Sequence, residues 1–259
     1  MPPHSARHFY DDLADDYHLL YSDWDAAVDR QGAALDQLIR GRLGAGSRRV
    51  WDCACGIGTQ ALGLASRGHE VLGTDISPAA AARARRESDA RGLSLRTAAG
   101  DMRRPPVPAG AFDVVLCADN SLAHLLTADD IDTALRAMHR SLREGGLLLI
   151  GLRDYEQARA DRRPATVPQV TRTETGRSIS FQLWDWYPDG ERYDLEHFQL
   201  LPDGDDWQVR VRRTTSWALT HTELGRLVTA AGFRDVEWLA PERTGFMQPV
   251  CTARRTTAP

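Results

Sequence analysis

The sequence predicts an α/β domain built on a doubly wound sheet of seven strands, and three observations lead to this fold class. Short apolar segments alternate with helical patterns over residues 48–155, as in consecutive βαβ units. The stretch from Arg48 to Asp75 reads as strand, glycine loop, helix, strand and terminal acid. The segment from Leu147 to Leu152 is apolar throughout, which is typical of a central parallel strand.

The loop after the first strand has the composition of a nucleotide-binding turn. It reads Cys53-Ala54-Cys55-Gly56-Ile57-Gly58 and follows Asp52 at the strand end. Gly56 and Gly58 let the backbone approach a ligand, and the first N–H groups of the next helix favour a negative charge. Asp75 ends the second strand, where a carboxylate can accept both hydroxyls of a ribose. This half of the sheet is therefore predicted to be Rossmann-like.

Two cofactor classes use this layout. Gly56-x-Gly58-x-x-Ala61 satisfies the dinucleotide pattern, whereas Asp52 to Gly58 fits the D-x-G-x-G-x-G pattern of class I S-adenosylmethionine-dependent methyltransferases, with Ala54 replacing the first glycine. Asp52 favours the second class, because a carboxylate repels a pyrophosphate and attracts the ammonium of methionine. Asp52 could also simply cap the loop by accepting backbone N–H bonds. We predict S-adenosylmethionine as the cofactor.

Residues 5–46 predict helices ahead of the sheet, ended by the glycines at 44 and 46. Aromatic side chains gather in this segment: Tyr10, Tyr17, Tyr21 and Trp24. They suit a lid whose rings attract a sulfonium or an ammonium, or rings that only pack the helices onto the domain. We expect Tyr21 and Trp24 at the cofactor and Tyr17 at the substrate.

The third, fourth and fifth strands end in polar residues at the same edge of the predicted sheet. Leu93–Ala98 leads to Asp101 and Met102, a carboxylate and an apolar side chain that suit the amine and the ring of an adenine. The fourth strand runs into Asp119, Asn120, Ser121 and His124, and the fifth leads to Arg153 and Tyr155. Ligands bind at this edge of α/β sheets, although Asp119, Asn120 or Ser121 could each cap a helix instead.

The rest of the chain predicts an insert and the end of the sheet. Residues 156–218 alternate partly and contain two Pro-Asp-Gly turns, which indicates a small antiparallel cap whose aromatic residues line a cavity or pair across strands. A helix capped by Thr220 and Glu223 follows, and two strands near 236–239 and 246–252 complete the sheet. We predict a helical lid over 1–46, a cofactor-binding core over 47–155 and 219–259, and a β-rich cap over 156–218.

Composition excludes several classes of protein. The net charge of −4 and the pI near 6.1 give no basic footprint for nucleic acid. No apolar run approaches the ~20 residues of a membrane helix, and the N-terminus lacks a signal-peptide core. The four cysteines fit a reducing cytoplasm, and Cys53-x-Cys55 is not a zinc spacing. We expect a cytoplasmic protein with no metal, membrane or nucleic-acid partner. Its oligomeric state stays open, with a homo-oligomer allowed.

With these segments together, the chain resembles the glycine and sarcosine N-methyltransferases. The matching stretches are YHLLYSDWD, DCACGIGTQALGLA, GTDIS, CADNSLAHL and LREGGLLLIGLRDY, which cover most of residues 10–155. The resemblance implies that Asn120 and Arg153 hold a substrate carboxylate and that Ser121 and His124 lie near the cofactor. A guanidinium fork also suits a carboxylate on physical grounds.

The complete predicted site has three groups of residues. The cofactor group is Tyr21, Trp24, Asp52, Ala54, Gly56, Gly58, Asp75, Ile76, Asp101, Met102, Cys117, Ala118, Ser121 and His124. The substrate group is Tyr17, Asn120, Arg153 and Tyr155. Asp119, which replaces a family glycine, and His197, which aligns with a family tyrosine, are the candidate proton acceptors.

These residues predict in-line methyl transfer to a small molecule, most readily to the neutral amine of an amino acid-like acceptor. Holding the reactants in line contributes ~7–11 kcal/mol to such a reaction. Three alternatives remain: an O-, C- or aromatic N-methyltransferase of a secondary metabolite, an NAD-dependent dehydrogenase, and a non-catalytic S-adenosylmethionine-binding module.

Overall fold

A seven-stranded sheet forms the centre of the protein, whose computed structural model describes residues 5–173 and 176–256. Its strands are β1 (Arg49–Asp52), β2 (Glu70–Asp75), β3 (Leu95–Ala99), β4 (Phe112–Cys117), β5 (Leu142–Gly151), β10 (Arg234–Leu239) and β11 (Val250–Arg254). Their spatial order is β10-β11-β5-β4-β1-β2-β3. Strands β1 to β5 pair in parallel, and β11 is antiparallel to both neighbours. The predicted doubly wound sheet is confirmed, and its last strand is antiparallel.

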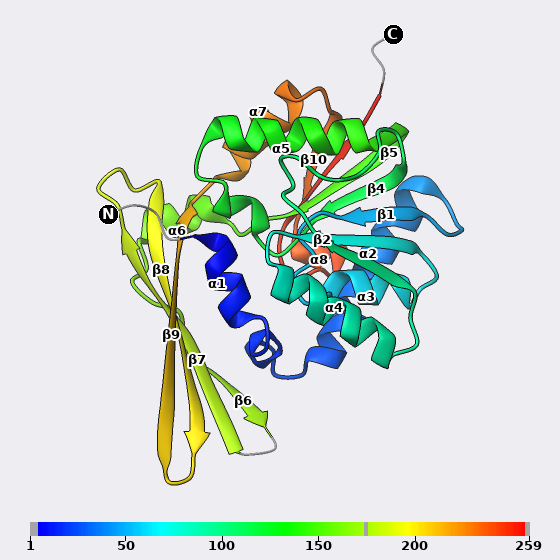
Figure 1. The fold of residues 1–259 in the computed structure, drawn as a ribbon. Helices are drawn as coiled ribbons and strands as arrows, with labels where there is room; N and C mark the ends of the chain where they lie inside the picture. Colours follow the sequence, from blue (N-terminus) through cyan, green and yellow to red (C-terminus); the bar gives the residue numbers. More distant parts are fainter. Residues whose placement is uncertain (1–4, 174–175, 257–259) are drawn as a thin grey trace.

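Helices cover both faces of this sheet (Figure 1). Trp51 and Val115 pack in one core cluster with α5 (Ala128–Ser141) and α7 (His221–Ala230). Val50 and Val114 pack in a second cluster with α2 (Trp24–Leu43) and α3 (Thr59–Ala65). Further helical segments are α4 (Pro78–Ala90), α6 (Tyr155–Asp161), α8 (Pro241–Thr244) and the short η2 (Ser121–His124). Neighbouring residues of one strand thus face opposite layers, as the period of a strand requires.

Side-chain caps begin three of the helices, and the predicted start at Thr220 is one of them. The Ser77 hydroxyl accepts from the N–H of Ala80 ahead of α4, and Thr127 caps α5 in the same way. Thr220 and Glu223 form a reciprocal capping box at α7. These are local interactions between residues three apart, so the sequence contains all the information they need.

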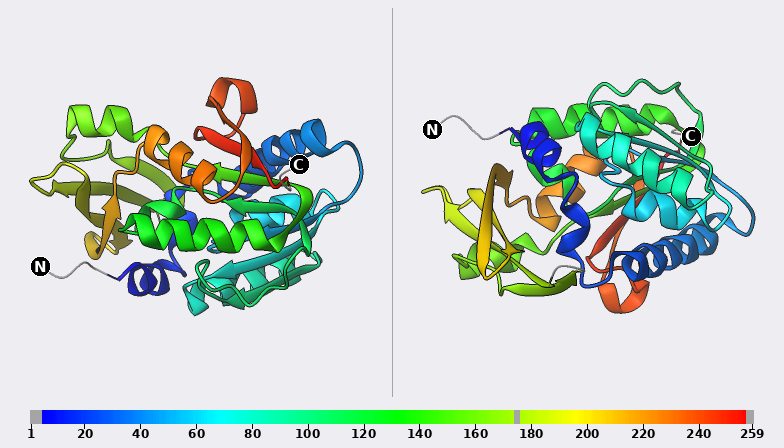
Figure 2. Two further views of the ribbon diagram at one scale, coloured as in Figure 1. Left: turned by 90° about the horizontal axis from the view of Figure 1, so that it is seen from above. Right: turned by 60° about the horizontal axis from the view of Figure 1, so that its bottom comes forward.

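A second sheet, here called the cap sheet, lies beside the core. It contains β6 (Gln169–Thr173), β7 (Gly176–Trp186), β8 (Arg192–Asp203) and β9 (Asp206–Trp217), paired antiparallel in that order. The N-terminal helix α1 (Ala6–Leu13) and the 3-10 turn η1 (Tyr17–Leu20) run between the cap sheet and the core (Figures 1 and 2). The expected antiparallel insert is therefore present.

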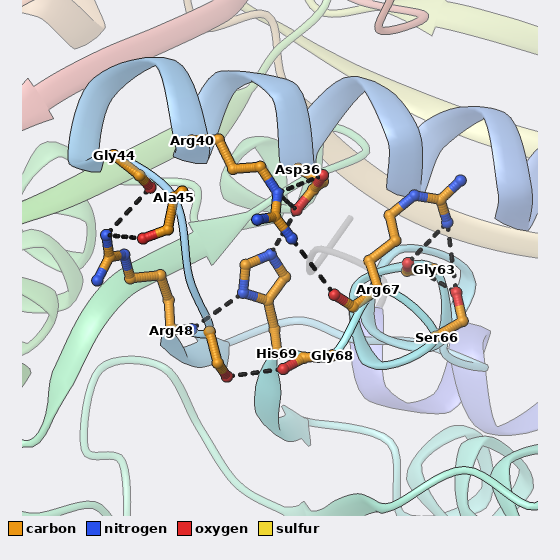
Figure 3. Close-up of polar contacts among 11 residues, drawn as sticks. Asp36, Arg40, Gly44, Ala45, Arg48, Gly63, Ser66, Arg67, Gly68 and His69 are labelled. Atoms are coloured by element: carbon orange, nitrogen blue, oxygen red, sulfur yellow. Dashed lines mark hydrogen bonds and ion pairs between the residues drawn. The ribbon is translucent and has the colours of Figure 1, made fainter.

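A glycine contact and a buried histidine hold α2 against α3 and β2. A Cβ at Gly63 would lie 2.4 Å from the carbonyl oxygen of Val28, so a larger residue would push the helices apart. The His69 ring, which is fully buried, lies between Arg48 and Asp36 in Figure 3. Its Nδ1 accepts from the Arg48 N–H at 3.1 Å, and its Nε2 lies 2.8 Å from Asp36 Oδ1. Because Nδ1 accepts, Nε2 carries the hydrogen and donates it to Asp36.

Candidate active site

Five charged residues follow successive parallel strands at one edge of the sheet. Asp52 ends β1 and Asp75 ends β2, while Asp101, Asp119 and Arg153 lie just beyond β3, β4 and β5. The strand order reverses between β1 and β4, and a crevice opens at such a switch point in α/β sheets. These five residues are spread over 102 positions of the sequence, and the fold brings them together at one edge of the sheet.

The glycine loop is fastened to the end of β2 by Asp75. One carboxylate oxygen accepts from the Gly56 N–H at 2.8 Å and the other from the Ser77 N–H at 2.9 Å. Burial raises the pKa of Asp75, and these two hydrogen bonds oppose the rise. Gly56 and Gly58 adopt φ values of +53° and +98°, a region that glycine occupies without strain. The loop backbone is thus shaped by Asp75 before any ligand arrives.

Asp52 is buried with one oxygen free of hydrogen bonds. Its Oδ1 accepts a long bond, 3.4 Å, from the Ala54 N–H, and its Oδ2 has no partner among the described residues. Burial, with a smaller contribution from the charge of Asp75, raises the pKa of Asp52 to about 7. An unpaired buried carboxylate oxygen is costly. A cationic group from a ligand would remove this cost, so the site fits the ammonium of a methionine moiety.

A cavity of about 460 Å³ opens beside this edge, and four separate parts of the chain line it: the N-terminal segment, the strand ends near 119–124 and 153, the cap region over 166–216, and residues 247–248. The N-terminal segment contributes mainly aromatic residues, and the cap sheet contributes mainly uncharged polar ones. The predicted site residues that line it are Tyr17, Tyr21, Asp119, Asn120, His124, Arg153 and His197. Gln182, Thr214, Met247 and Gln248 also line it and were not predicted as site residues. Tyr193 lines it too, and it is one of the cap aromatic residues for which the sequence left open a place in a cavity or a cross-strand pair.

Asp119 lies in this cavity in a strained backbone conformation. Its φ is +52° and that of Asn120 is +67°, values that are uncommon outside glycine and that cluster at functional sites. The Tyr17 hydroxyl donates to Asp119 Oδ2 at 2.9 Å and the Tyr21 hydroxyl at 3.3 Å. Burial raises the pKa of Asp119, against the opposing effects of the Tyr17 bond and the Arg153 charge. The cavity lining therefore contains a carboxyl group that accepts hydrogen bonds from two tyrosines.

Arg153 and Asn120 belong to one polar chain. Asn120 accepts from the backbone N–H of Arg153 at 3.2 Å and donates to the Tyr155 hydroxyl at 2.6 Å. The Tyr155 and Tyr193 hydroxyls are 2.9 Å apart. The Arg153 guanidinium lies 4.8 Å from the ring centre of Trp184, and its buried Nη1 has no hydrogen-bond partner among the described residues. That free donor can serve an oxygen of a bound acceptor.

A half-buried histidine, His124, and a buried one, His197, line the cavity. Burial lowers the pKa of His124 to about 4 and that of His197 to about 4. His124 Nε2 lies 2.8 Å from the Tyr10 hydroxyl, whereas His197 Nε2 has no hydrogen-bond partner within the described ranges. Both rings are neutral at pH 7, and a base of such low pKa accepts a proton only weakly.

Asp101 lies outside the cavity lining and is held by an arginine. The Arg103 guanidinium binds both oxygens of Asp101 at 2.6–3.1 Å and reaches Asp130 at 2.8 Å. These bonds lower the pKa of Asp101. To bind adenine, the Asp101 carboxylate would have to accept hydrogen bonds from both Arg103 and the ligand. The adenine-binding roles of Asp101 and Met102 stay predictions.

Other predicted cofactor residues have structural contacts. The Trp24 indole donates to Thr59 Oγ1 at 2.9 Å, and the Arg91 guanidinium lies 4.8 Å above its ring. The Ser121 hydroxyl donates to the Ala118 carbonyl. Cys117 and Ala118 are buried and Ile76 is partly exposed. These contacts are within the protein and do not test cofactor binding, so the cofactor-binding roles of these residues stay predictions.

Residues 5–173 and 176–256 contain no membrane-spanning helix and no cluster of metal ligands. None of their helices combines the length and apolar character needed to cross a bilayer. Over the same residues, no three His, Cys, Asp or Glu side chains gather as metal ligands.

Comparison with known proteins identifies the domain. Residues 50–146, from β1 into β5, match the family described as "Methyltransferase domain". The chain carries a class I methyltransferase domain. S-adenosylmethionine is the cofactor of this domain class, which agrees with the cofactor predicted from Asp52 and the glycine loop.

Relatives with similar sequences are named as methyltransferases of different substrates. A glycine/sarcosine N-methyltransferase of Parasynechococcus marenigrum (strain WH8102) is 32% identical over 155 residues, covering 60% of this chain and 54% of that protein. A demethylmenaquinone methyltransferase of Thermus thermophilus is 39% identical over 105 residues, covering 40% and 46%. The chain thus spans about half the length of these curated relatives.

Solved structures extend the similarity to nearly the whole chain. An amino pentose methyltransferase from Micromonospora echinaspora, determined with S-adenosylmethionine bound, has a TM-score of 0.74 at 22% identity. The match covers 93% of this chain and 95% of that one. At this identity the likeness establishes the fold alone.

Proposed function

We propose that this protein is an S-adenosylmethionine-dependent N-methyltransferase of a small-molecule amine. The observation that carries the proposal is the half-buried Asp119 carboxylate in the lining of the cavity beside the cofactor edge. When bound, S-adenosylmethionine supplies an electrophilic methyl group on its sulfonium. A carboxylate attracts the ammonium form of an acceptor and can receive its proton, and the amine is nucleophilic only after this proton has left.

Each remaining part of the site has a proposed task. Asp52 holds the methionine ammonium and Asp75 the ribose, while Arg153 and Asn120 orient the acceptor. The lid and the cap sheet exclude water from the cavity. Alignment of this kind is worth roughly 7–11 kcal/mol without any metal. Burial raises the pKa of Asp119 and lowers the pKa of His197 to about 4, and both directions favour Asp119 as the proton acceptor.

Two acceptor classes fit different parts of the cavity. An amino acid-like acceptor of the glycine or sarcosine type is supported by the free donor of Arg153. An amino sugar is the second candidate, supported by the neutral hydrogen-bonding residues Thr166, Ser180, Gln182 and Ser216 in the lining. A volume of about 460 Å³ lies within the ~300–1,000 Å³ of sites for larger ligands, and one fold relative is an amino pentose methyltransferase.

The test is release of S-adenosylhomocysteine from S-adenosylmethionine in the presence of each acceptor. Glycine, sarcosine and dimethylglycine form one panel, and amino sugars, free and nucleotide-linked, form the other. Turnover with the first panel supports the amino acid-like acceptor, and turnover with the second supports the amino sugar. Methylation at oxygen or carbon in the product would contradict N-methylation. Thermal stabilisation by NAD and none by S-adenosylmethionine would contradict the whole proposal.

A further inference from the structure

Trp184 lies behind the cavity lining and contacts three of the residues that form it. The lining includes Arg153, Gln182 and Tyr193. Trp184 itself is 8% exposed and lies outside this lining. Its indole stacks on the Tyr193 ring with the ring centres 4.5 Å apart, and its backbone N–H donates to the Pro164 carbonyl at 2.8 Å. The ring and the backbone of Trp184 are therefore both held in place.

The face of the Trp184 indole holds the Arg153 guanidinium. The guanidinium carbon lies 4.8 Å from the centre of the ring, within the ~6 Å at which an aromatic face attracts a cation. The carboxylate of Asp119 lines the same cavity but accepts from Tyr17 and Tyr21. Nη1 of Arg153 is buried and has no hydrogen-bond partner among the described residues. Arg153 thus keeps a charged donor free for an anion.

The N–H of the same indole fixes the amide of Gln182. Trp184 Nε1 donates to Gln182 Oε1 at 3.1 Å, so the amide nitrogen is the end that can donate to a bound ligand. The backbone of Gln182 is held as well, because its N–H donates to Thr166 Oγ1 at 2.9 Å and its carbonyl accepts from the Thr166 N–H at 2.9 Å. Gln182 therefore adds a neutral donor to the cavity lining.

We infer that Trp184 is a positioning residue for the methyl acceptor: its face holds Arg153 and its N–H holds Gln182, so that both donate to one carboxylate. Because the two side chains contact the same indole, their donors lie at neighbouring points of the lining. A carboxylate takes several donors on its two oxygens, and a charged donor binds it more strongly than it binds a neutral hydroxyl. The inference rests on the proposed function and favours its amino acid-like acceptor over the amino sugar.

Acetate tests this anion-binding end of the cavity without any need for turnover. Acetate and acetamide have nearly the same shape, but only acetate is charged. In NMR titrations of the protein saturated with S-adenosylhomocysteine, wild type should bind acetate about tenfold more tightly than acetamide, because a charged acceptor strengthens the bonds from both donors. Trp184→Leu should lose most of this preference. Equal binding of the two probes by wild type, or an unchanged preference in Trp184→Leu, would overturn the inference.

Acceptor kinetics then separate the two contacts of the indole. Trp184→Phe keeps an aromatic face for Arg153 and removes the N–H, so KM for an amino acid acceptor should rise about threefold to tenfold. Trp184→Leu removes both contacts, and KM should rise about 30-fold or more. In both variants kcat should fall less than about threefold, because the lost contacts serve binding rather than the transition state alone. Gln182→Leu removes one donor and leaves the indole in place, so it should behave as Trp184→Phe does even if the tryptophan variants fold poorly.

The matched control is Trp186→Leu, two residues along β7 on the same face. Trp186 also packs on Tyr193, with ring centres 5.1 Å apart, but its indole donates to the Arg163 carbonyl. KM and the preference for acetate should therefore match wild type. A rise in KM equal to that of Trp184→Leu would assign the effect to general packing and contradict the inference, as would a wild-type KM in Trp184→Leu. No turnover with any amine would refute the proposed function, whereas the acetate titrations test the anion-binding end independently.

Discussion

At the scale of single residues, Asp52 connects cofactor binding to pH. Its pKa in the folded protein is about 7, above the ordinary value near 3.9. The folded state therefore binds this proton more tightly than the unfolded state, and the cofactor-free protein loses stability as pH rises from about 4 to about 7. A bound ammonium requires the charged carboxylate, so cofactor binding has the opposite pH dependence.

We predict that affinity for S-adenosylmethionine rises with pH up to about 7, by as much as about tenfold per unit below that pH. Above about 8 it should fall again as the α-amino group of the cofactor loses its proton. Calorimetric titration from pH 5.5 to 8.5 measures this dependence. Asp52→Asn should bind more weakly and lack the rise. An identical rise in Asp52→Asn would mean that another group titrates.

A substitution at Asp119 should change the reaction with the acceptor and leave cofactor binding nearly unchanged. Asparagine tolerates positive φ, so Asp119→Asn should keep the backbone and the bonds from Tyr17 and Tyr21. It removes the negative charge, and kcat/KM for an amine acceptor should fall about 100-fold or more. The dissociation constant for S-adenosylmethionine should stay within about twofold. Steady-state kinetics with binding measurements check both values, and unchanged kcat/KM would exclude Asp119 as proton acceptor.

At the scale of secondary-structure elements, His69 fixes the start of β2 to α2 (Figure 3). Removing its ring would leave the Arg48 N–H and the Asp36 carboxylate without this partner. His69→Ala should lower the free energy of unfolding by roughly 2–4 kcal/mol, from the lost hydrogen bonds and the cavity. Urea unfolding measures this change.

The matched control for His69 is His8→Ala, whose side chain is 80% exposed in an ion pair with Asp12. That substitution should cost less than about 1 kcal/mol. Cofactor affinity should be unchanged in both variants, because neither histidine lies at the strand-end edge. Equal losses of stability in the two variants would refute the anchoring role of His69.

Elements that depend on local chemistry could be predicted from the sequence. Ser77 and Thr220 start helices through partners three residues away, and strand ends could be placed because parallel strands end at one edge. The last strand was expected over 246–252, whereas β11 is Val250–Arg254. The preceding residues form a loop that brings Gln248 to the cavity. The apolar pattern of this segment does not distinguish strand from buried loop.

At the scale of the whole molecule, the cavity depends on packing between distant segments. Tyr17 reaches Asp119, and Tyr155 meets Tyr193, across 102 and 38 positions. Asp119 and Arg153 could be placed at the site from strand order. Thr214 could not, and for Tyr193 the sequence left both a cavity and a cross-strand pair open, because the positions of these residues follow from how the cap sheet docks on the core. The hydrophobic periodicity of the sequence does not indicate how the cap sheet docks on the core.

One partly buried ion cluster maintains this docking. Asp16 Oδ2 accepts from Arg210 at 2.5 Å and from Arg212 at 2.6 Å, and Arg212 also donates to the carbonyl of Asp12 at 2.9 Å. The Arg212 side chain is 8% exposed and that of Asp16 is 14% exposed. Tyr17, which lines the cavity, follows Asp16 directly. Fastening Asp16 to β9 therefore also positions Tyr17 in the cavity.

We predict that Asp16→Asn loosens the lid. Breaking a buried pair leaves a guanidinium without its counter-charge, so stability should fall by roughly 2–4 kcal/mol, and KM for the acceptor should rise more than kcat falls. The control is Asp15→Asn, one residue earlier, whose side chain is 89% exposed and whose loss should cost less than about 1 kcal/mol. Urea unfolding, acceptor kinetics and limited proteolysis of the N-terminal segment distinguish the two. If both variants behave alike, the lid is held by its aromatic packing rather than by the Asp16 cluster.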